Sequence, residues 1–198
     1  MRNRHQCACA LLVAAAAGGV AAISAGWAEP SRPTIYCGAD AWTPRWSVKT
    51  LTDKAAHHVD WKPRSTTVAK LRSLERPPRV TSGTPRQASE RQVFLLRGRL
   101  LRFQLRTNND YELVVADPRD TRRAIVAAIP SPDCTVGAQH RAAMTRVRDT
   151  FNQECLNLKH PTVVTIAGVR FFASRPFPSH SAPNGAELAP LLTFTSSC

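Results

Sequence analysis

Apolar and polar side chains alternate along most of the C-terminal half of the chain, which is the pattern of strands that bury one face. This alternation predicts strands over 92–106, 111–116, 123–129, 162–172 and 188–195. Between the third and fourth strands, a helical period predicts a helix over 139–152, with His140, Met144, Val147 and Phe151 on its apolar face. The expected order is therefore three strands, a helix and two strands.

The first of these strands is long and its pattern changes in the middle. In the first half, the apolar side chains lie opposite Arg97 and Arg99. After Leu100 the pattern slips by one residue, and the apolar face is then expected to consist of Leu101, Phe103 and Leu105. Such a slip needs one extra residue, so we expect a β-bulge beside Gly98. A bent first strand in this order predicts a mainly β fold, a five-stranded OB-type barrel over 92–198; a generic α+β sandwich is the alternative.

Residues 29–91 form a different region, an N-terminal arm rich in proline and tryptophan. One short helix is predicted after an N-cap at Ser65 or Thr66, and Pro77 ends it. Residues 77–90 are expected to form a flexible loop. The tryptophans are expected to pack on the barrel domain, and a platform for sugar stacking is the alternative interpretation.

Residues 1–28 have the layout of a secretory signal peptide. Arg2 and Arg4 give a positive start, residues 7–24 carry no charge, and small residues follow where signal peptidase would cut. The alternative is a membrane-spanning helix, but the uncharged run is short and rich in alanine and glycine. We therefore expect a secreted or periplasmic protein without a transmembrane span.

The chain is strongly basic, with a net charge of +13. Removal of the signal peptide takes away two arginines and no acid, so about +11 remains. Such a charge favours an acidic polymer, nucleic acid or acidic glycan, as the partner of a monomeric protein. The alternative is that the arginines reflect only GC-rich coding.

Four cysteines remain after processing: Cys37, Cys134, Cys155 and Cys198. An even number in an exported chain indicates two disulfides, for which three pairings exist. Cys134 and Cys155 bracket one local segment, so we expect the pairs Cys134–Cys155 and Cys37–Cys198. No cysteine or histidine spacing typical of a metal site is present.

Several motifs resemble those of an uncharacterised family of secreted bacterial proteins. Residues 108–114 resemble Asp-x-Asp-x-His-Leu-Val, residues 168–173 resemble Gly-Val-x-Phe-Phe-Asp, and residues 182–190 resemble Ala-Pro-Asn-Gly-x-Glu-Leu-His-Pro. Residues 48–53 also match the front of that family. The resemblance spans most of the mature chain but implies no established activity.

This chain departs from the family motifs at the residues best suited to chemistry. Asn108 and Ala173 stand where the family has aspartate, and Glu112 and Ala189 stand where it has histidine. The remaining acids are Asp110, Glu112, Asp117 and Glu187, which are weak candidates for a site holding Ca²⁺ or Mg²⁺. The alternative interpretation makes the aspartates turn residues and Glu112 a solvent-facing strand residue.

We therefore expect a non-catalytic, secreted, disulfide-stabilised OB-type binding module without a cofactor. Its candidate polyanion-binding residues are Arg97, Arg99, Arg102, Arg106, Arg123, Arg170 and Tyr111. One alternative is a metal-dependent nuclease or phosphodiesterase-like hydrolase, weakened or lost in this chain, which would need a divalent cation. A second alternative is a structural protein of the cell envelope.

Overall fold

A computed structural model describes residues 37, 45–174 and 181–198, so the predicted signal peptide lies outside the described residues. The elements belong to one compact unit, Thr34–Cys198. In chain order they are α1 (Trp46–Thr50), the 3-10 helix η1 (Lys54–His58), β1 (Asp60–Ser65), α2 (Val68–Arg72), η2 (Ala88–Glu90), β2 (Gln92–Leu105), β3 (Tyr111–Ala116), β4 (Ala124–Ile129), η3 (Pro132–Thr135), α3 (Arg141–Glu154), β5 (Thr162–Phe172) and β6 (Ala186–Ser196).

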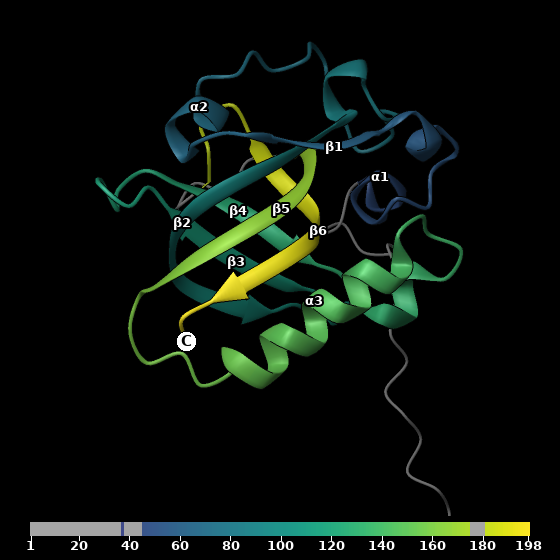
Figure 1. Ribbon diagram of the computed structural model, residues 1–198. Helices are drawn as coiled ribbons and strands as arrows, with labels where there is room; N and C mark the ends of the chain where they lie inside the picture. The colour runs from purple at the N-terminus through teal and green to yellow at the C-terminus, as the bar shows by residue number, and fades with distance from the viewer. Residues whose placement is uncertain (1–36, 38–44, 175–180) are drawn as a thin grey trace, which may run out of the picture. The chain divides into compact units, whose positions relative to one another are not determined.

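Five of the strands close into a barrel of the OB type. Neighbouring strands follow the order β2, β3, β4, β6 and β5, and β5 pairs back with β2. Four of these pairings are antiparallel, and β4 with β6 is parallel. Helix α3 joins β4 to β5 and lies across one end of the barrel (Figure 1). The predicted order of strands and helix is confirmed.

Strand β2 closes the barrel because it bends in the middle. Its residues Val93–Leu100 pair with β5, whereas Arg99–Leu105 pair with β3, and the register with β3 shifts between Leu100 and Arg102. This confirms the predicted β-bulge. Gly98 lies beside it, at a point where a Cβ would come within 2.5 Å of a side chain of β3, so the bend depends on a residue without a side chain.

One detail of the predicted pattern around the bulge is wrong. Phe103 packs against the barrel core as expected, but Leu101 packs with Val114 on the outer face and Leu105 is 56% exposed. A bulge sets two successive residues of one strand opposite one residue of its partner, which leaves Leu101 on the outer face beside Arg102. Leu105 is exposed because it is the last residue of β2.

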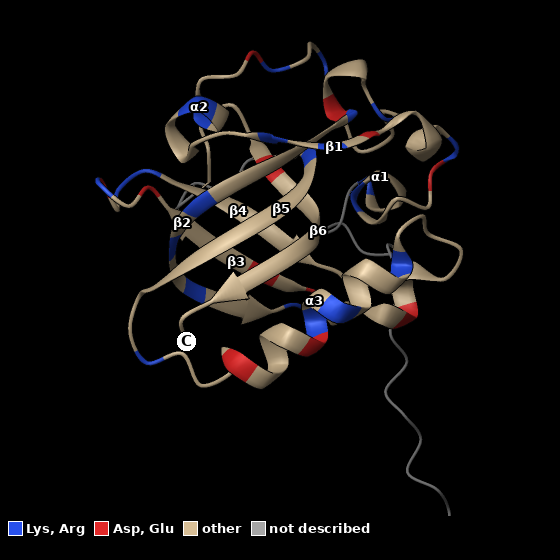
Figure 2. Cartoon of the chain, in the orientation of Figure 1, with Lys and Arg blue, Asp and Glu red and all other residues tan. Residues whose placement is uncertain are grey.

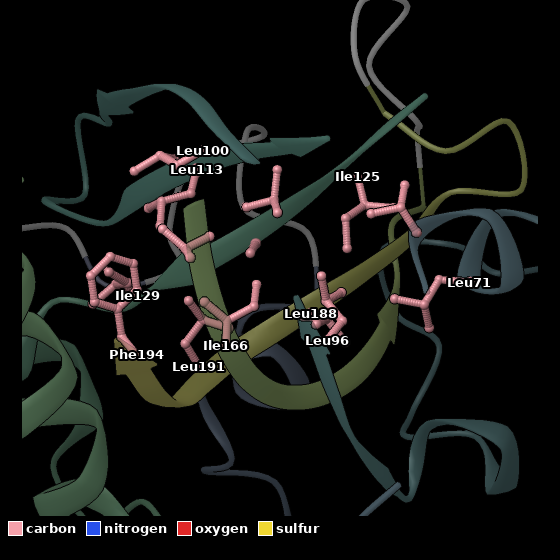
Figure 3. Packing of buried hydrophobic residues seen from close by; sticks show 14 of the residues in the cluster. Leu71, Leu96, Leu100, Leu113, Ile125, Ile129, Ile166, Leu188, Leu191 and Phe194 are labelled. Atoms are coloured by element: carbon pink, nitrogen blue, oxygen red, sulfur yellow. The ribbon is translucent and has the colours of Figure 1, made fainter. Parts of the chain in front are cut away.

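The barrel interior is filled by aliphatic side chains from all five strands (Figure 3). Phe151 and Val147 of α3 close one end, and Val68 and Leu71 of α2 join the same cluster. The predicted helix face is confirmed for its last three residues. His140 is the exception: it is exposed at the N-cap position of α3, where its ring lies 4.0 Å from that of Trp61.

Residues 45–91 pack on the outside of the barrel. Leu51, Ala56 and Val59 form a second cluster with apolar residues of β2 and β5. A buried ion pair fixes this layer: Arg45 Nη1 donates to Glu90 Oε1 at 2.7 Å and to the carbonyl oxygen of Phe172 at 2.8 Å. Trp61 packs against the second cluster, as expected for packing of the arm on the barrel.

The disulfides are Cys37–Cys134 and Cys155–Cys198, so the predicted pairing of Cys134 with Cys155 and of Cys37 with Cys198 is wrong. Cys134 precedes α3 and Cys155 follows it. Helix α3 has 14 residues, and at ~1.5 Å per residue it separates its two ends by about 21 Å. A disulfide requires Cα atoms within about 7 Å of each other, so these two cysteines do not meet.

Candidate functional site

Three of the predicted arginines, Arg97, Arg99 and Arg102, lie along β2, where basic residues recur in Figure 2, and Arg106 directly follows the strand. Leu96 and Leu100 point into the core, so Arg97 and Arg99 point outward. Residues two apart on one face of a strand are separated by about 7 Å. After the bulge, inward-pointing Phe103 leaves Arg102 on the outer face as well. Arg97, Arg99 and Arg102 therefore lie on the outside of β2.

A pocket of about 160 Å³ lies on this outer face, over β2, β3 and β4. Arg102 and Arg106 line it on the β2 side, and Glu112 lines it from β3. Its apolar lining includes Val114 and Val126, whose chain neighbours point into the barrel core. The pocket therefore combines guanidinium groups with an aliphatic surface. We call Arg102, Arg106, Glu112, Val114 and Val126 the outer pocket.

A buried group of charges adjoins the outer pocket. The Nζ atom of Lys49, from α1, lies 3.5 Å from Glu112 Oε1 and 3.6 Å from Glu187 Oε2. The other oxygen of Glu112 lies 3.3 Å from Arg106 Nε. Glu187 faces the same side as Val126, its register partner on β4. Two carboxylates thus share one buried ammonium, and Glu112 links it to the arginine at the pocket. We call Lys49, Glu112, Glu187 and Arg106 the charge cluster.

Burial and charge act in opposite directions on these groups. Burial opposes the charge of Lys49, but the attraction of Glu187, Glu112 and Asp110 outweighs it and raises the pKa of the lysine. Burial raises the pKa of Glu187, and repulsion by Glu112 adds to that rise, while the attraction of Lys49 opposes it without cancelling it. Glu187 Oε2 is buried and has no hydrogen-bond partner among the described residues. The buried part of the cluster therefore carries an excess of negative charge.

The four candidate acids are not gathered into one site. Glu112 and Glu187 meet at Lys49, but the carboxylate of Asp110 accepts hydrogen bonds at 2.8 Å from the backbone N–H of Ser131 and from the amide of Asn108. Asp117 accepts a hydrogen bond from a backbone N–H two residues on, as in an Asx turn. Within the described ranges, no three histidine, cysteine or acidic side chains are placed to hold a metal ion.

Asp110 still contributes to the electrostatics of this region. Its own burial raises its pKa, and the attraction of Lys49 and the hydrogen bonds of the turn oppose that rise. The turn interpretation of the two aspartates fits their contacts. Glu112, by contrast, is not a simple solvent-facing residue, because it pairs with both Lys49 and Arg106.

Three residues predicted for the polyanion face lie elsewhere or are engaged. Tyr111 is buried, its ring packs edge-on to Phe103, and Arg148 covers it at 4.3 Å, so it offers no stacking surface. Arg170 lies between Val169 and Phe171 of β5, which pack in the clusters outside the barrel core. Its guanidinium lies 5.4 Å from the ring centre of Phe94 and is partly buried. It points away from the outer face because neighbouring strand residues point to opposite faces of a sheet.

Arg123 lies in the exposed turn between β3 and β4. Its Nε atom is 3.2 Å from Asp120, which also pairs with Arg122 at 3.0 Å. One acid therefore serves two arginines, and the turn remains basic. It follows Ala116, whose register partner on β2 is Arg99, so it extends the arginine surface of β2.

Lys49 is the residue that the sequence analysis missed. It lies in a helix of only five residues, and both of its acidic partners are distant in the chain. Its only sequence signal was its place in the matched segment 48–53. Ala173 and Ala189 pack with Val48 beside it. The charge cluster and these alanines thus occupy neighbouring parts of one outer face.

No protein-family model matches the chain, and no curated protein matches it. No helix in the described part of the chain is long and apolar enough to cross a membrane. The fold and the covalent links define the class: a closed, five-stranded OB-type barrel with two disulfides.

Proposed function

We propose that the mature chain is a secreted, non-catalytic binding module that prefers polyanions and binds them at the outer face of β2, β3 and β4. The observation that carries this proposal is the outer pocket, where Arg102 and Arg106 flank an aliphatic surface. Two disulfides fit an oxidising compartment outside the cytoplasm, which supports secretion.

The place of the pocket in the fold supports the same conclusion. OB-type barrels bind oligonucleotides and oligosaccharides on the outer face of their second and third strands. In this barrel those strands are β3 and β4, and the pocket contains one valine from each, Val114 and Val126. The arginines of β2 lie beside that face, where they would neutralise the acidic groups of a bound polymer.

The test is retention of the oxidised mature chain on heparin and on single-stranded DNA as a function of salt concentration. Reversal of Arg99 and Arg102 to glutamate should weaken retention and flatten its dependence on salt, because fewer counterions are released on binding. The matched control carries Arg141→Glu and Arg146→Glu, the same change of charge on exposed residues of α3. Equal retention of both variants would contradict binding at the β2 face and would leave only bulk charge.

A second candidate function is a metal-dependent phosphodiester hydrolase, and the meeting of Glu112 and Glu187 favours it. A hard cation bound by carboxylates could polarise a phosphodiester. In this chain, however, the ammonium of Lys49 already pairs with both acids. This candidate predicts cleavage of nucleic acid that requires a divalent cation and is lost in Glu187→Gln. The absence of turnover with every metal of a panel would exclude it.

A further inference from the structure

The outer pocket offers an aliphatic surface and guanidinium groups, but its aromatic side chain is engaged elsewhere. Phe103 lines the pocket, yet its ring packs edge-on against Phe151 and Tyr111 in the core. Proteins that hold single-stranded nucleic acid usually stack its bases on exposed aromatic rings. The pocket residues and the arginines of β2 supply no such ring, so they favour a ligand recognised through its acidic groups.

The size of the pocket points to part of a polymer rather than to a whole small ligand. Its volume is about 160 Å³, whereas pockets for drug-sized ligands measure roughly 300–1,000 Å³. Arginine binds carboxylates and similar planar or tetrahedral oxyanions through charge-assisted hydrogen bonds. A carboxylate or sulfate carried by a sugar ring fits these features, because the ring can cover the valines while its acidic group meets the arginines.

Arg106 is already in contact with a carboxylate of the protein itself. Its Nε atom lies 3.3 Å from Glu112 Oε2, and Glu112 is 15% exposed at the pocket. An acidic ligand at Arg106 must therefore compete with this internal carboxylate. Glu112 has an advantage over the ligand, because Lys49 pairs with its other carboxylate oxygen and keeps Glu112 oriented toward Arg106.

We propose that the outer pocket binds an acidic sugar residue, sulfated or carboxylated, of a glycan chain, and that Glu112 limits its affinity by occupying Arg106. This inference rests on the proposed polyanion-binding function and deepens it. Neutralising Glu112 leaves Lys49 paired with Glu187 and removes the excess negative charge of the buried part of the cluster, so the fold should tolerate the change.

The experiment measures affinity for a heparin-derived hexasaccharide and for a thymidine oligonucleotide of equal charge, by titration at fixed salt. Glu112→Gln should bind the hexasaccharide about three- to tenfold more tightly than the wild type, the worth of one partly buried ion pair. The matched control is Glu75→Gln, the same change of charge at an exposed glutamate after α2. Its bulk effect should stay below about twofold in screened solution. Misfolding cannot produce the gain expected of Glu112→Gln.

A second variant tests the pocket without changing its charge. Val126→Phe fills the space beside the arginines and should lower hexasaccharide affinity at least about fivefold, while the weaker oligonucleotide binding changes little. Circular dichroism and thermal unfolding establish that this variant is folded. If it unfolds, Val114→Ile, a smaller filling of the same space, replaces it.

The outcomes separate this inference from the proposed function. If Glu112→Gln and Glu75→Gln behave alike while charge reversal of Arg99 and Arg102 abolishes retention, polyanion binding stands and the role of Glu112 is wrong. If the oligonucleotide binds as tightly as the hexasaccharide, the preference for a glycan is wrong. If neither probe binds the wild type, the proposed function fails and the inference fails with it.

Discussion

Replacement of Lys49 by methionine tests whether the charge cluster holds the N-terminal layer on the barrel. Methionine keeps an unbranched stem beside Phe171, so mainly the positive charge is lost. Glu187 is then left buried beside Glu112 without a cation of its own. Breaking a buried ion pair by removing one partner costs about 3–5 kcal/mol. We expect about 3 kcal/mol, the low end, because Arg106 still pairs with Glu112 and is 24% exposed.

The assay is urea unfolding of the oxidised chain at pH 7, followed by tryptophan fluorescence, with Lys70→Met as the control. Lys70 is exposed on α2, so its replacement should change the free energy of unfolding by less than about 0.5 kcal/mol. Adding Glu187→Gln to Lys49→Met should restore about 2 kcal/mol, since the unpaired carboxylate is then gone.

The loss should also depend on pH, with a definite sign. Glu187 has a pKa raised above its ordinary 4.5 by burial, and losing the attraction of Lys49 raises that pKa further. A raised carboxyl pKa favours the folded state below about pH 4.5, and this advantage is lost as pH rises through the folded pKa. The difference in free energy of unfolding between the wild type and Lys49→Met should therefore be small near pH 4 and reach its full value at pH 7. A Lys49→Met variant as stable as Lys70→Met at pH 7 would refute the reasoning.

Three further substitutions test how much a disulfide, the bend of β2 and a buried ion pair stabilise the fold. Replacing Cys155 and Cys198 with alanine opens a loop of 43 residues and should cost about 4 kcal/mol on the chain-entropy model, measured by urea unfolding against the oxidised protein. Gly98→Ala should cost about 1–3 kcal/mol, because its Cβ would clash with β3 at the bend. The control Gly83→Ala should be near neutral, because a Cβ there would have nothing within 4 Å. Equal melting temperatures of the two variants would contradict the need for glycine at the bend. Glu90→Gln should cost about 3 kcal/mol, because it leaves the buried guanidinium of Arg45 without its carboxylate partner. A loss of less than about 1 kcal/mol in the free energy of chemical unfolding would show that the ion pair is dispensable.

The barrel was largely predictable because its strands carry local patterns. The predicted strand over 111–116 coincides with β3, and the strand over 162–172 coincides with β5. The bend at Leu100 followed from the slip in alternation, because a bulge leaves its trace in the sequence beside it. Strand β1 gave no such signal: it is short, mostly exposed and interrupted by Pro63.

Contacts between distant parts of the chain could not be predicted in the same way. The predicted disulfide pairing was wrong because the 14-residue helix α3 lies between Cys134 and Cys155 and holds these two neighbouring cysteines apart. Lys49 was missed because its partners Glu112 and Glu187 lie on two other strands of the barrel.

The sequence by itself determined the order and type of the barrel elements and placed the arginines of β2 on one face of that strand. Both follow from the alternation of buried and exposed side chains, which neighbouring residues set locally. Only the tertiary structure decided that Arg106 shares Glu112 with Lys49, that Tyr111 is buried, and that the acids separate into a charge cluster and two turns. These outcomes depend on which surfaces meet when the barrel closes and the N-terminal layer packs on it, and no local pattern encodes that meeting.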